Sequence, residues 1–183
     1  LVNVRGEDKT TREARRFRQR DAAWDFYTDL QGAGFGSRTG IDFPGEASGD
    51  LPAPEDWRRD RLLSVPMGQS VAVTPLQLIR GYCMLVNGGR LMKPHLILRR
   101  TTPDGTVLYE REVEELGRPI SEKTSFTMRG LLRGVIEHSD ALSRMDDPDT
   151  LLGGKTGTAQ IAENGKYADR KYVGSFCGIA PFH

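Results

Sequence analysis

This sequence has few cysteines, few histidines and no long apolar run. Each shortage argues against one kind of feature: a disulfide framework, a metal site, or a membrane helix. The two cysteines, Cys83 and Cys177, are too few for a disulfide framework, and both lie in apolar runs that predict buried thiols. The three histidines, His95, His138 and His183, lack metal-ligand spacing, so we expect no metal site and no cofactor. No run of 18 apolar residues and no signal-peptide pattern occurs, so the sequence offers no candidate membrane helix or secretory leader.

Charge is also nearly balanced. The 26 Lys and Arg residues against 25 Asp and Glu residues leave a net charge of +1, which gives no reason to expect a nucleic acid partner. Residues 5–20 are a local exception, with seven basic residues around Phe17. This pattern predicts a solvated arm or helix, with a binding patch as the alternative. We therefore divide the 183 residues into an Arg-rich arm, 1–20, and one partial domain, 21–183.

The first half of that domain has two helical patterns. One starts at an N-cap predicted at Asp21 and ends at the glycines after residue 31; its apolar residues, at i, i+3, i+4 and i+7, are Ala23, Phe26, Tyr27 and Leu30. Residues 40–60 are rich in Pro, Gly and Asp, and within them the run from Gly40 to Glu46 predicts an ordered surface loop. Thr74-Pro75 then predicts a capped helix through Val86. Its apolar residues cover most of its circumference, so we expect burial on more than one side.

The second half predicts an alternation of strands and helix. Residues 95–101 and 106–113 flank Pro103-Asp104-Gly105 and predict a β-hairpin. A helix should follow Ser121, with one apolar stripe between residues 128 and 136. Residues 151–162 and 172–180 then predict a strand pair whose connection contains the turn signal Asn164-Gly165 and residues 167–171.

The segment Gly154-Lys155-Thr156-Gly157-Thr158-Ala159-Gln160 has three interpretations. A nucleotide-binding loop would need a glycine five residues before Gly154, where the sequence has Asp149, and a helix after Thr156. An ordinary hairpin strand would turn Lys155 toward solvent. The third interpretation is an exposed strand that lines an acyl-transfer cleft.

Each residue of that strand would have a task in acyl transfer. Lys155 supplies a fixed positive charge that attracts a substrate carboxylate. Thr156 and Thr158 should share one side of the strand and present two hydroxyl donors. Gly157 lacks a Cβ, so a substrate peptide can lie against the strand edge and pair with its backbone.

This segment resembles the third motif of the penicillin-binding proteins, the serine D,D-transpeptidases that cross-link peptidoglycan, and the resemblance favours the monofunctional class of cell division or elongation. It extends in order from about Trp24 to Pro181, through residues 35–46, Gly68-Gln69-Ser70 to Leu78, and Lys171-Tyr172-Val173-Gly174-Ser175-Phe176. It implies an α/β fold in which helices flank an antiparallel sheet, as in β-lactamases, here incomplete.

The resemblance also implies roles, ligands and a location. Lys155 and Thr158 would be catalytic residues, the backbone N–H of Thr158 forming half of the oxyanion hole, and Thr156, Gly157 and Thr158 would bind substrate. The ligands would be the peptidoglycan stem peptide and β-lactams, and a membrane-embedded cell-wall glycosyltransferase would be the partner. The location would be the extracytoplasmic face of the bacterial inner membrane.

The sequence departs from the family at the nucleophile. No serine is followed three residues later by lysine, and no Ser-x-Asn occurs, so this chain contains no nucleophile of the family's type. We therefore expect the chain to supply the Lys-Thr-Gly strand to a domain whose serine lies outside it. The alternative is a catalytically inactive, transpeptidase-like binding or scaffolding module.

Overall fold

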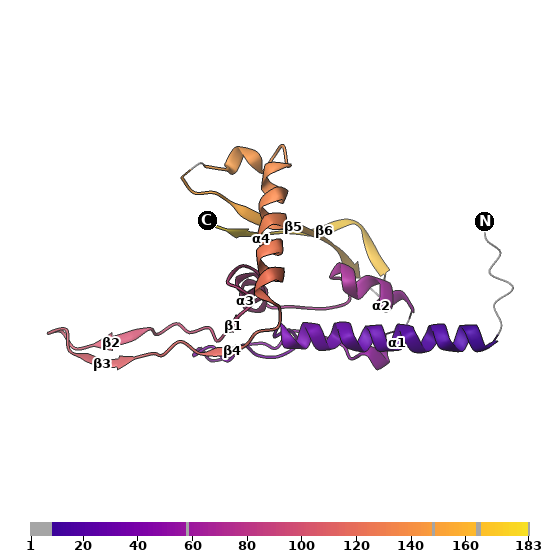
Figure 1. The fold of residues 1–183 in the computed structure, drawn as a ribbon, viewed down its shortest axis with the longest axis horizontal. Coiled ribbons are helices and arrows are strands. Elements are labelled where there is room, and N and C mark those ends of the chain that lie inside the picture. The colour runs from indigo at the N-terminus through magenta and orange to yellow at the C-terminus, as the bar shows by residue number, and fades with distance from the viewer. Residues whose placement is uncertain (1–8, 58, 148, 164–165, 183) are drawn as a thin grey trace.

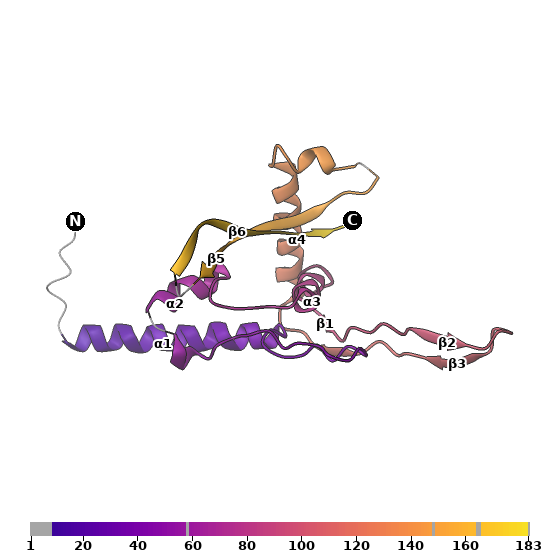
Figure 2. The same ribbon diagram turned by 180° about the vertical axis from the view of Figure 1, so that it is seen from behind.

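The computed structural model describes residues 9–57, 59–147, 149–163 and 166–182, as helices joined by three antiparallel strand pairs. The helices are α1 (Lys9–Gly32), α2 (Arg59–Ser64), α3 (Pro75–Val86) and α4 (Glu122–Glu137), with the 3-10 turns η1 (Pro54–Asp56), η2 (Val65–Met67) and η3 (Ser143–Met145). The strands are β1 (Leu91–Met92), β2 (Arg99–Thr101), β3 (Val107–Glu110), β4 (Glu115–Gly117), β5 (Gly153–Glu163) and β6 (Lys166–Ile179). Helix α1 and the β2–β3 hairpin extend in opposite directions, and α4 stands across the middle (Figure 1). The same arrangement is seen from behind in Figure 2.

Helix α1 is longer than the apolar pattern predicts. It begins at Lys9, so the N-cap predicted at Asp21 is wrong. Arginine is frequent before residue 21 and is accompanied by Glu13, Ala14 and Gln19, and all four residue types are strong helix formers. Residues 1–8 and the side chains of residues 9–19 lie outside the described part of the chain, and the division at residue 20 stays a prediction. The predicted apolar face does pack: Ala23 is buried with Trp57 and Val65.

Helix α3 has the predicted boundaries. The Thr74 hydroxyl accepts a hydrogen bond from Gln77 N at 3.1 Å, and Gln77 Oε1 accepts one from Thr74 N at 2.9 Å. This reciprocal capping box, with Pro75 at the first position, fixes the start of the helix. The helix ends at Val86, followed by Asn87.

The burial predicted for α3 is wrong in part. The residues on its inner face include Gln77 and Arg80, and the apolar Ile79 on the opposite face is 55% exposed. Cys83 shares that outer face and is exposed, and Cys177 is only half-buried, so the two thiols are less buried than predicted. The reason is that the inner face of α3 binds the polar backbone of a loop.

That loop contains residues 34–49, and two side chains of α3 bind three of its backbone carbonyls. Gln77 Nε2 donates to Ser37 O at 2.6 Å and to Ser48 O at 2.7 Å, and Arg80 Nη2 donates to Gly34 O at 2.6 Å. Because these carbonyls are satisfied by side chains, the loop is ordered without being a strand or a helix. The ordered loop predicted from Gly40 to Glu46 is confirmed, and its ends are joined by a hydrogen bond from Gly40 N to Glu46 Oε2 at 3.0 Å.

The predicted hairpin and the helix after Ser121 both form, although β2 and β3 are shorter than the predicted strands at residues 95–101 and 106–113. Strands β2 and β3 pair antiparallel, and β1 pairs with β4 at the base of the hairpin. The Ser121 hydroxyl caps α4 by accepting from Thr124 N at 3.1 Å. Leu132 and Ile136 of the predicted stripe are buried, whereas Leu131 is 60% exposed. Helix α4 packs against α3 and β5.

Strands β5 and β6 form a long pair in which Lys155 lies opposite Cys177 and Gln160 lies opposite Tyr172. Residues 167–171, predicted to belong to the connection, are instead part of β6. The extra residues are accommodated by a register shift after Gln160, near Arg170, whose φ is 57°. The turn signal Asn164-Gly165 lies outside the described residues.

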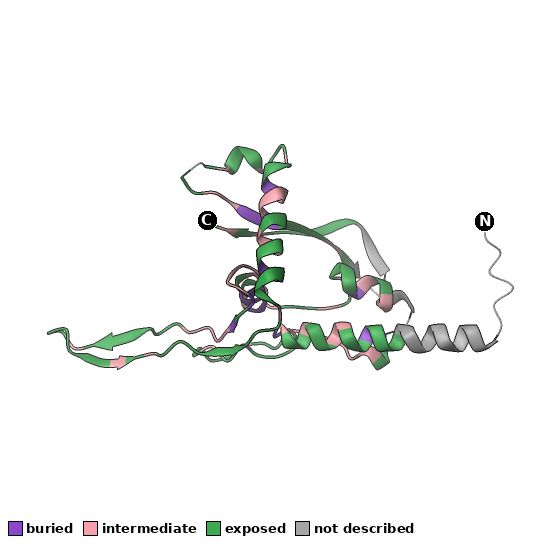
Figure 3. Ribbon diagram, viewed as in Figure 1, coloured by how far each residue is buried: buried purple, intermediate pink, exposed green. Residues whose placement is uncertain are grey.

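Buried residues are few and scattered among these elements (Figure 3). One group, Ala23, Trp57 and Val65, joins α1 to the segment around α2. Many large apolar side chains are exposed on the hairpin and on β6. None of the described helices is long and apolar enough to cross a membrane.

Candidate functional site

The site predicted from sequence lies on the first half of β5. Two glycines at its start are buried because aromatic rings occupy the space of their missing side chains. A Cβ on Gly153 would lie 2.3 Å from the Phe182 ring, and one on Gly154 would lie 2.8 Å from the Phe176 ring. The following residues, from Lys155 to Thr158, are exposed.

These four exposed residues alternate between the two faces of the strand. Pairing with β6 is regular from Gly153 to Gln160, so Thr156 and Thr158 share one face, and Lys155 shares the other with Gly157. Gly157 lies opposite Ser175, and a Cβ on it would approach the Ser175 hydroxyl oxygen to 2.6 Å. The missing side chain therefore makes room for Ser175.

One edge of this strand is open. Strand β6 pairs with one edge of β5, and no strand within the described residues pairs with the other. The unpaired edge offers backbone N–H and C=O groups to an extended peptide.

All four predicted site residues line one hollow of about 470 Å³. Its other walls are mostly apolar, with Gln69, Tyr82 and Ser175 as polar exceptions. They come from α1, α3, β6 and residues 65–73, together with Phe35 and Leu51. Among the residues that form these walls, all within the described part of the chain, Lys155 carries the single charge. Its ammonium donates to Thr156 O at 2.8 Å. Because Lys155 is exposed, water screens its charge in part, and the apolar walls reduce that screening for an anionic ligand bound in the hollow.

Two titratable groups that line the hollow together with Lys155 have raised pKa values. Burial raises the pKa of Tyr82, and the nearby Cys177 adds to this effect. Burial also raises the pKa of the Cys177 thiol, with a further contribution from Cys83. A raised pKa lowers the thiolate fraction of Cys177 at neutral pH, and with it the reactivity of the thiol.

The four residues predicted on β5 line the hollow, but the residues of β6 that also line it were not predicted as site residues. Ser175 and Cys177 reach the hollow because β6 pairs with β5 in a register that brings them opposite Gly157 and Lys155. Pairing continued without a shift from Glu163 and Lys166 would place Gly157 opposite Tyr172, and the register shift between Gln160 and Ala162 brings Ser175 there instead. No pattern in the sequence indicated that shift. Within the described residues no group of three His, Cys, Asp or Glu side chains could hold a metal ion.

Comparison with known proteins gives a consistent result. A family model described as "Penicillin binding protein transpeptidase domain" matches residues 13–182. The chain is 35% identical over 164 residues to penicillin-binding protein PbpB of Mycolicibacterium smegmatis. The alignment covers 85% of this chain and 25% of that protein. The chain is 32% identical over 148 residues to the probable peptidoglycan D,D-transpeptidase PbpC of Pseudomonas aeruginosa, covering 81% of this chain and 24% of that protein.

Solved structures agree with the sequence matches. The crystal structure of penicillin-binding protein 3 from Mycobacterium tuberculosis complexed with ampicillin superimposes with a TM-score of 0.75 at 32% identity. The match covers 86% of this chain and 36% of that one. The chain therefore spans about a quarter of the length of the curated relatives it matches.

Proposed function

The chain belongs to the penicillin-binding protein transpeptidase domain family, and from that premise we propose that it supplies the Lys-Thr-Gly substrate-binding strand of a peptidoglycan D,D-transpeptidase. Its helices and antiparallel strands are part of the family's α/β fold. The observation that carries the proposal is the placement of Lys155, Thr156, Gly157 and Thr158 around one hollow with a single charge.

The ligand is proposed to be a stem peptide that ends in D-alanyl-D-alanine. Its carboxylate would accept hydrogen bonds from the Thr156 and Thr158 hydroxyls, which share one face of β5. The Lys155 ammonium would add a charge that favours the bound carboxylate. The peptide backbone would lie along the open edge beside Gly157.

The reaction would be acyl transfer in two steps. A serine hydroxyl attacks the carbonyl between the two D-alanines, the C–N bond breaks, and the terminal D-alanine leaves with the hydroxyl proton on its amine. An amine of a second stem peptide then attacks the ester, forms the cross-link and returns the proton to the serine. The Thr158 backbone N–H would stabilise the oxyanion in both steps. The serine must come from a segment outside this chain, because the sequence contains no Ser-x-x-Lys.

The missing serine also favours a second candidate function. A transpeptidase-like module without a nucleophile would use the same hollow to bind a peptide without cleaving it. The residues encoded upstream of Leu1 discriminate between the two. An in-frame Ser-x-x-Lys followed by Ser-x-Asn supports the enzyme, and their absence from the full reading frame supports the binding module.

Binding can be tested on the chain itself with a fluorescent peptide that ends in D-alanyl-D-alanine. We expect Thr156→Val and Thr158→Val each to weaken binding about tenfold, the effect of losing a hydrogen bond to a charged group. Thr101→Val is the matched control, because Thr101 is an exposed strand threonine on the distant hairpin. Equal affinity of the wild type and all three variants would refute the proposed role of this strand.

Acylation is the second test. We expect the chain alone to form no covalent adduct with a fluorescent penicillin, because it has no serine nucleophile of the required type. Intact mass spectrometry should show the unmodified mass after incubation. A stable acyl adduct on any serine would contradict this expectation.

We further propose the family's setting for the whole protein. Its work would lie on the extracytoplasmic face of the inner membrane, with β-lactams as inhibitors and a membrane-embedded cell-wall glycosyltransferase as partner. The solved relative that holds ampicillin supports the β-lactam part of this proposal.

A further inference from the structure

We propose that Arg133 and Asp146 are positioning residues that fix where β5 begins, and through it the place of Lys155. The link to ligand binding rests on the proposed function, whereas the positioning of the strand does not. Neither residue belongs to the walls of the hollow. Their effect on the site would therefore be transmitted through the backbone.

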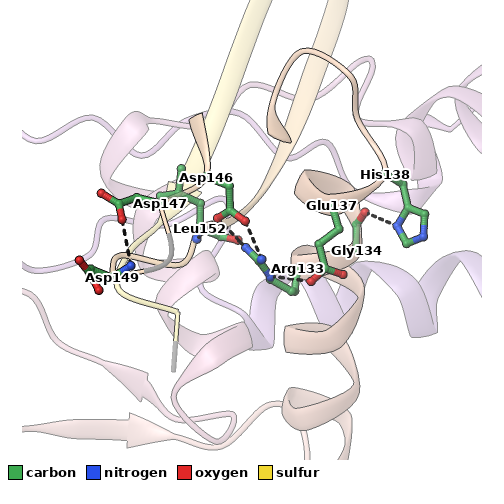
Figure 4. A network of polar contacts seen from close by, with 8 residues as sticks. All are labelled: Arg133, Gly134, Glu137, His138, Asp146, Asp147, Asp149 and Leu152. Carbon is green, nitrogen blue, oxygen red and sulfur yellow. Dashed lines mark hydrogen bonds and ion pairs between the residues drawn. The ribbon is translucent and has the colours of Figure 1, made fainter. Parts of the chain in front are cut away.

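The pair is bidentate and partly buried. Arg133 Nη1 donates to Asp146 Oδ1 at 2.7 Å, and Nη2 donates to Oδ2 at 2.6 Å (Figure 4). Each side chain is only 19% exposed. Two parallel hydrogen bonds between a guanidinium and a carboxylate fix both the separation and the relative orientation of the groups.

Both partners also bind the backbone of Leu152, the residue just before β5. Arg133 Nη1 donates to Leu152 O at 2.8 Å, and Asp146 Oδ1 accepts from Leu152 N at 3.0 Å. The ion pair thus satisfies both polar backbone groups of one residue, three positions before Lys155. Helix α4, which carries Arg133, packs against both α3 and β5 and so connects the pair to the rest of the fold.

A second contact secures the neighbouring residue. Phe182 N donates to Leu151 O at 2.8 Å, and the Phe182 ring lies against Gly153. Leu151, Leu152 and Gly153 are therefore held in succession, whereas the residues from Lys155 to Thr158 are exposed. The direction in which the exposed part of β5 continues therefore depends on how these three residues are held.

The third contact of Arg133 provides a control. Arg133 Nε donates to Glu137 Oε1 at 2.9 Å, and Glu137 is half exposed on the same helix. Glu137→Gln removes that charge without touching Leu152. It separates the charge balance of α4 from the positioning of β5.

Hydrogen exchange of the chain, followed by mass spectrometry, tests the inference. We expect Arg133→Gln and Asp146→Asn to speed exchange of the amides of residues 152–156 about tenfold relative to those of α3. Glu137→Gln should leave both regions unchanged. Uniform acceleration throughout the chain, or no acceleration at residues 152–156, would overturn the inference.

A charge swap distinguishes positioning from a plain ion pair. The double variant Arg133→Asp with Asp146→Arg keeps opposite charges, but its position 133 offers no donor to Leu152 O and its position 146 offers no acceptor to Leu152 N. We expect the fast exchange at residues 152–156 to persist in this variant. Restored protection would mean that charge pairing alone suffices, and would overturn the inference.

Binding of the D-alanyl-D-alanine peptide separates this inference from the proposed function. We expect Arg133→Gln to weaken binding severalfold while Glu137→Gln does not. If the wild type binds no peptide but the local exchange pattern is as expected, the proposed function fails and the positioning of β5 stands. If the wild type and Arg133→Gln bind equally well, the pair does not serve the site and the inference is overturned.

Discussion

Replacing Gln77 by methionine should destabilise the chain strongly, although the two side chains have nearly the same shape. Gln77 is 1% exposed on the inner face of α3. Its amide donates to Ser37 O at 2.6 Å and to Ser48 O at 2.7 Å, and its Oε1 accepts from Thr74 N at 2.9 Å. Methionine offers none of these bonds, and it fills the space, so cavity formation contributes little.

The expected loss follows from the three backbone groups that would be left without a partner. An unsatisfied buried polar group costs about 1 to 3 kcal/mol. Ser37 and Ser48 are themselves exposed, so water can reach their carbonyls in part, and the lower end of that range applies. Three groups at the lower end give a loss of about 3 kcal/mol in the free energy of unfolding.

Urea unfolding followed by tryptophan fluorescence measures this loss, because Trp57 is buried in the cluster beside α1. Gln31→Met is the matched control. Gln31 is exposed, and its amide donates a hydrogen bond to the Tyr27 hydroxyl at 3.0 Å. We therefore expect the free energy of unfolding to change by less than about 0.5 kcal/mol. A loss below about 1 kcal/mol for Gln77→Met would refute the argument that this amide holds the loop.

Three further predictions concern pH, backbone strain and the sheet edge. Hydrogen bonds from Arg133 and then from Leu152 N hold the Asp146 pKa below its ordinary value of 3.8, so the stability that this carboxylate contributes is complete above about pH 5 and is lost as pH falls through the lowered pKa. The melting temperature of Asp146→Asn should therefore vary less with acid pH than that of the wild type. Equal pH dependence of the two melting temperatures would contradict this. Ser70 has a φ of 62°, so Ser70→Gly should raise the free energy of unfolding by about 0.5 to 1 kcal/mol, whereas Ser64→Ala, which removes the same hydroxyl contact, should not. The chain alone should melt broadly and bind an apolar dye, because Val173 and other large side chains of β6 are exposed; a sharp melt with little dye binding would count against it.

Local signals in the sequence predicted the elements whose ends depend on nearby residues. The boundaries of α3 follow from Thr74 and Pro75 at its start, and the cap of α4 follows from Ser121. The strand that carries Lys155 was recognised from its own residues. These features are set within a few positions of the chain, so one sequence is enough to find them.

Features that depend on contacts distant in sequence were missed. Apolar periodicity predicts which residues could be buried, but it does not predict that Gln77 would be buried through bonds to carbonyls 29 and 40 residues away. The ion pair of Arg133 with Asp146 has the same origin, because it depends on how the connection after α4 folds back. The wall of the hollow opposite Lys155 depends on a strand register that a bulge near Arg170 alters.

The apolar walls of the hollow and the missing serine can be explained by the same absent contact. Those walls are mostly apolar, with Lys155 as the single charge among them, and apolar surface of this extent is costly to leave against water. A segment from elsewhere in the protein with an apolar face and one serine would cover those walls and place a hydroxyl beside the cation. The same segment would complete the catalytic group, since a cation lowers the cost of ionising a neighbouring proton donor. On the proposed function, therefore, stability and reactivity of the domain depend on the same contact, and adding that segment to the chain should raise its melting temperature and make it react with penicillin together.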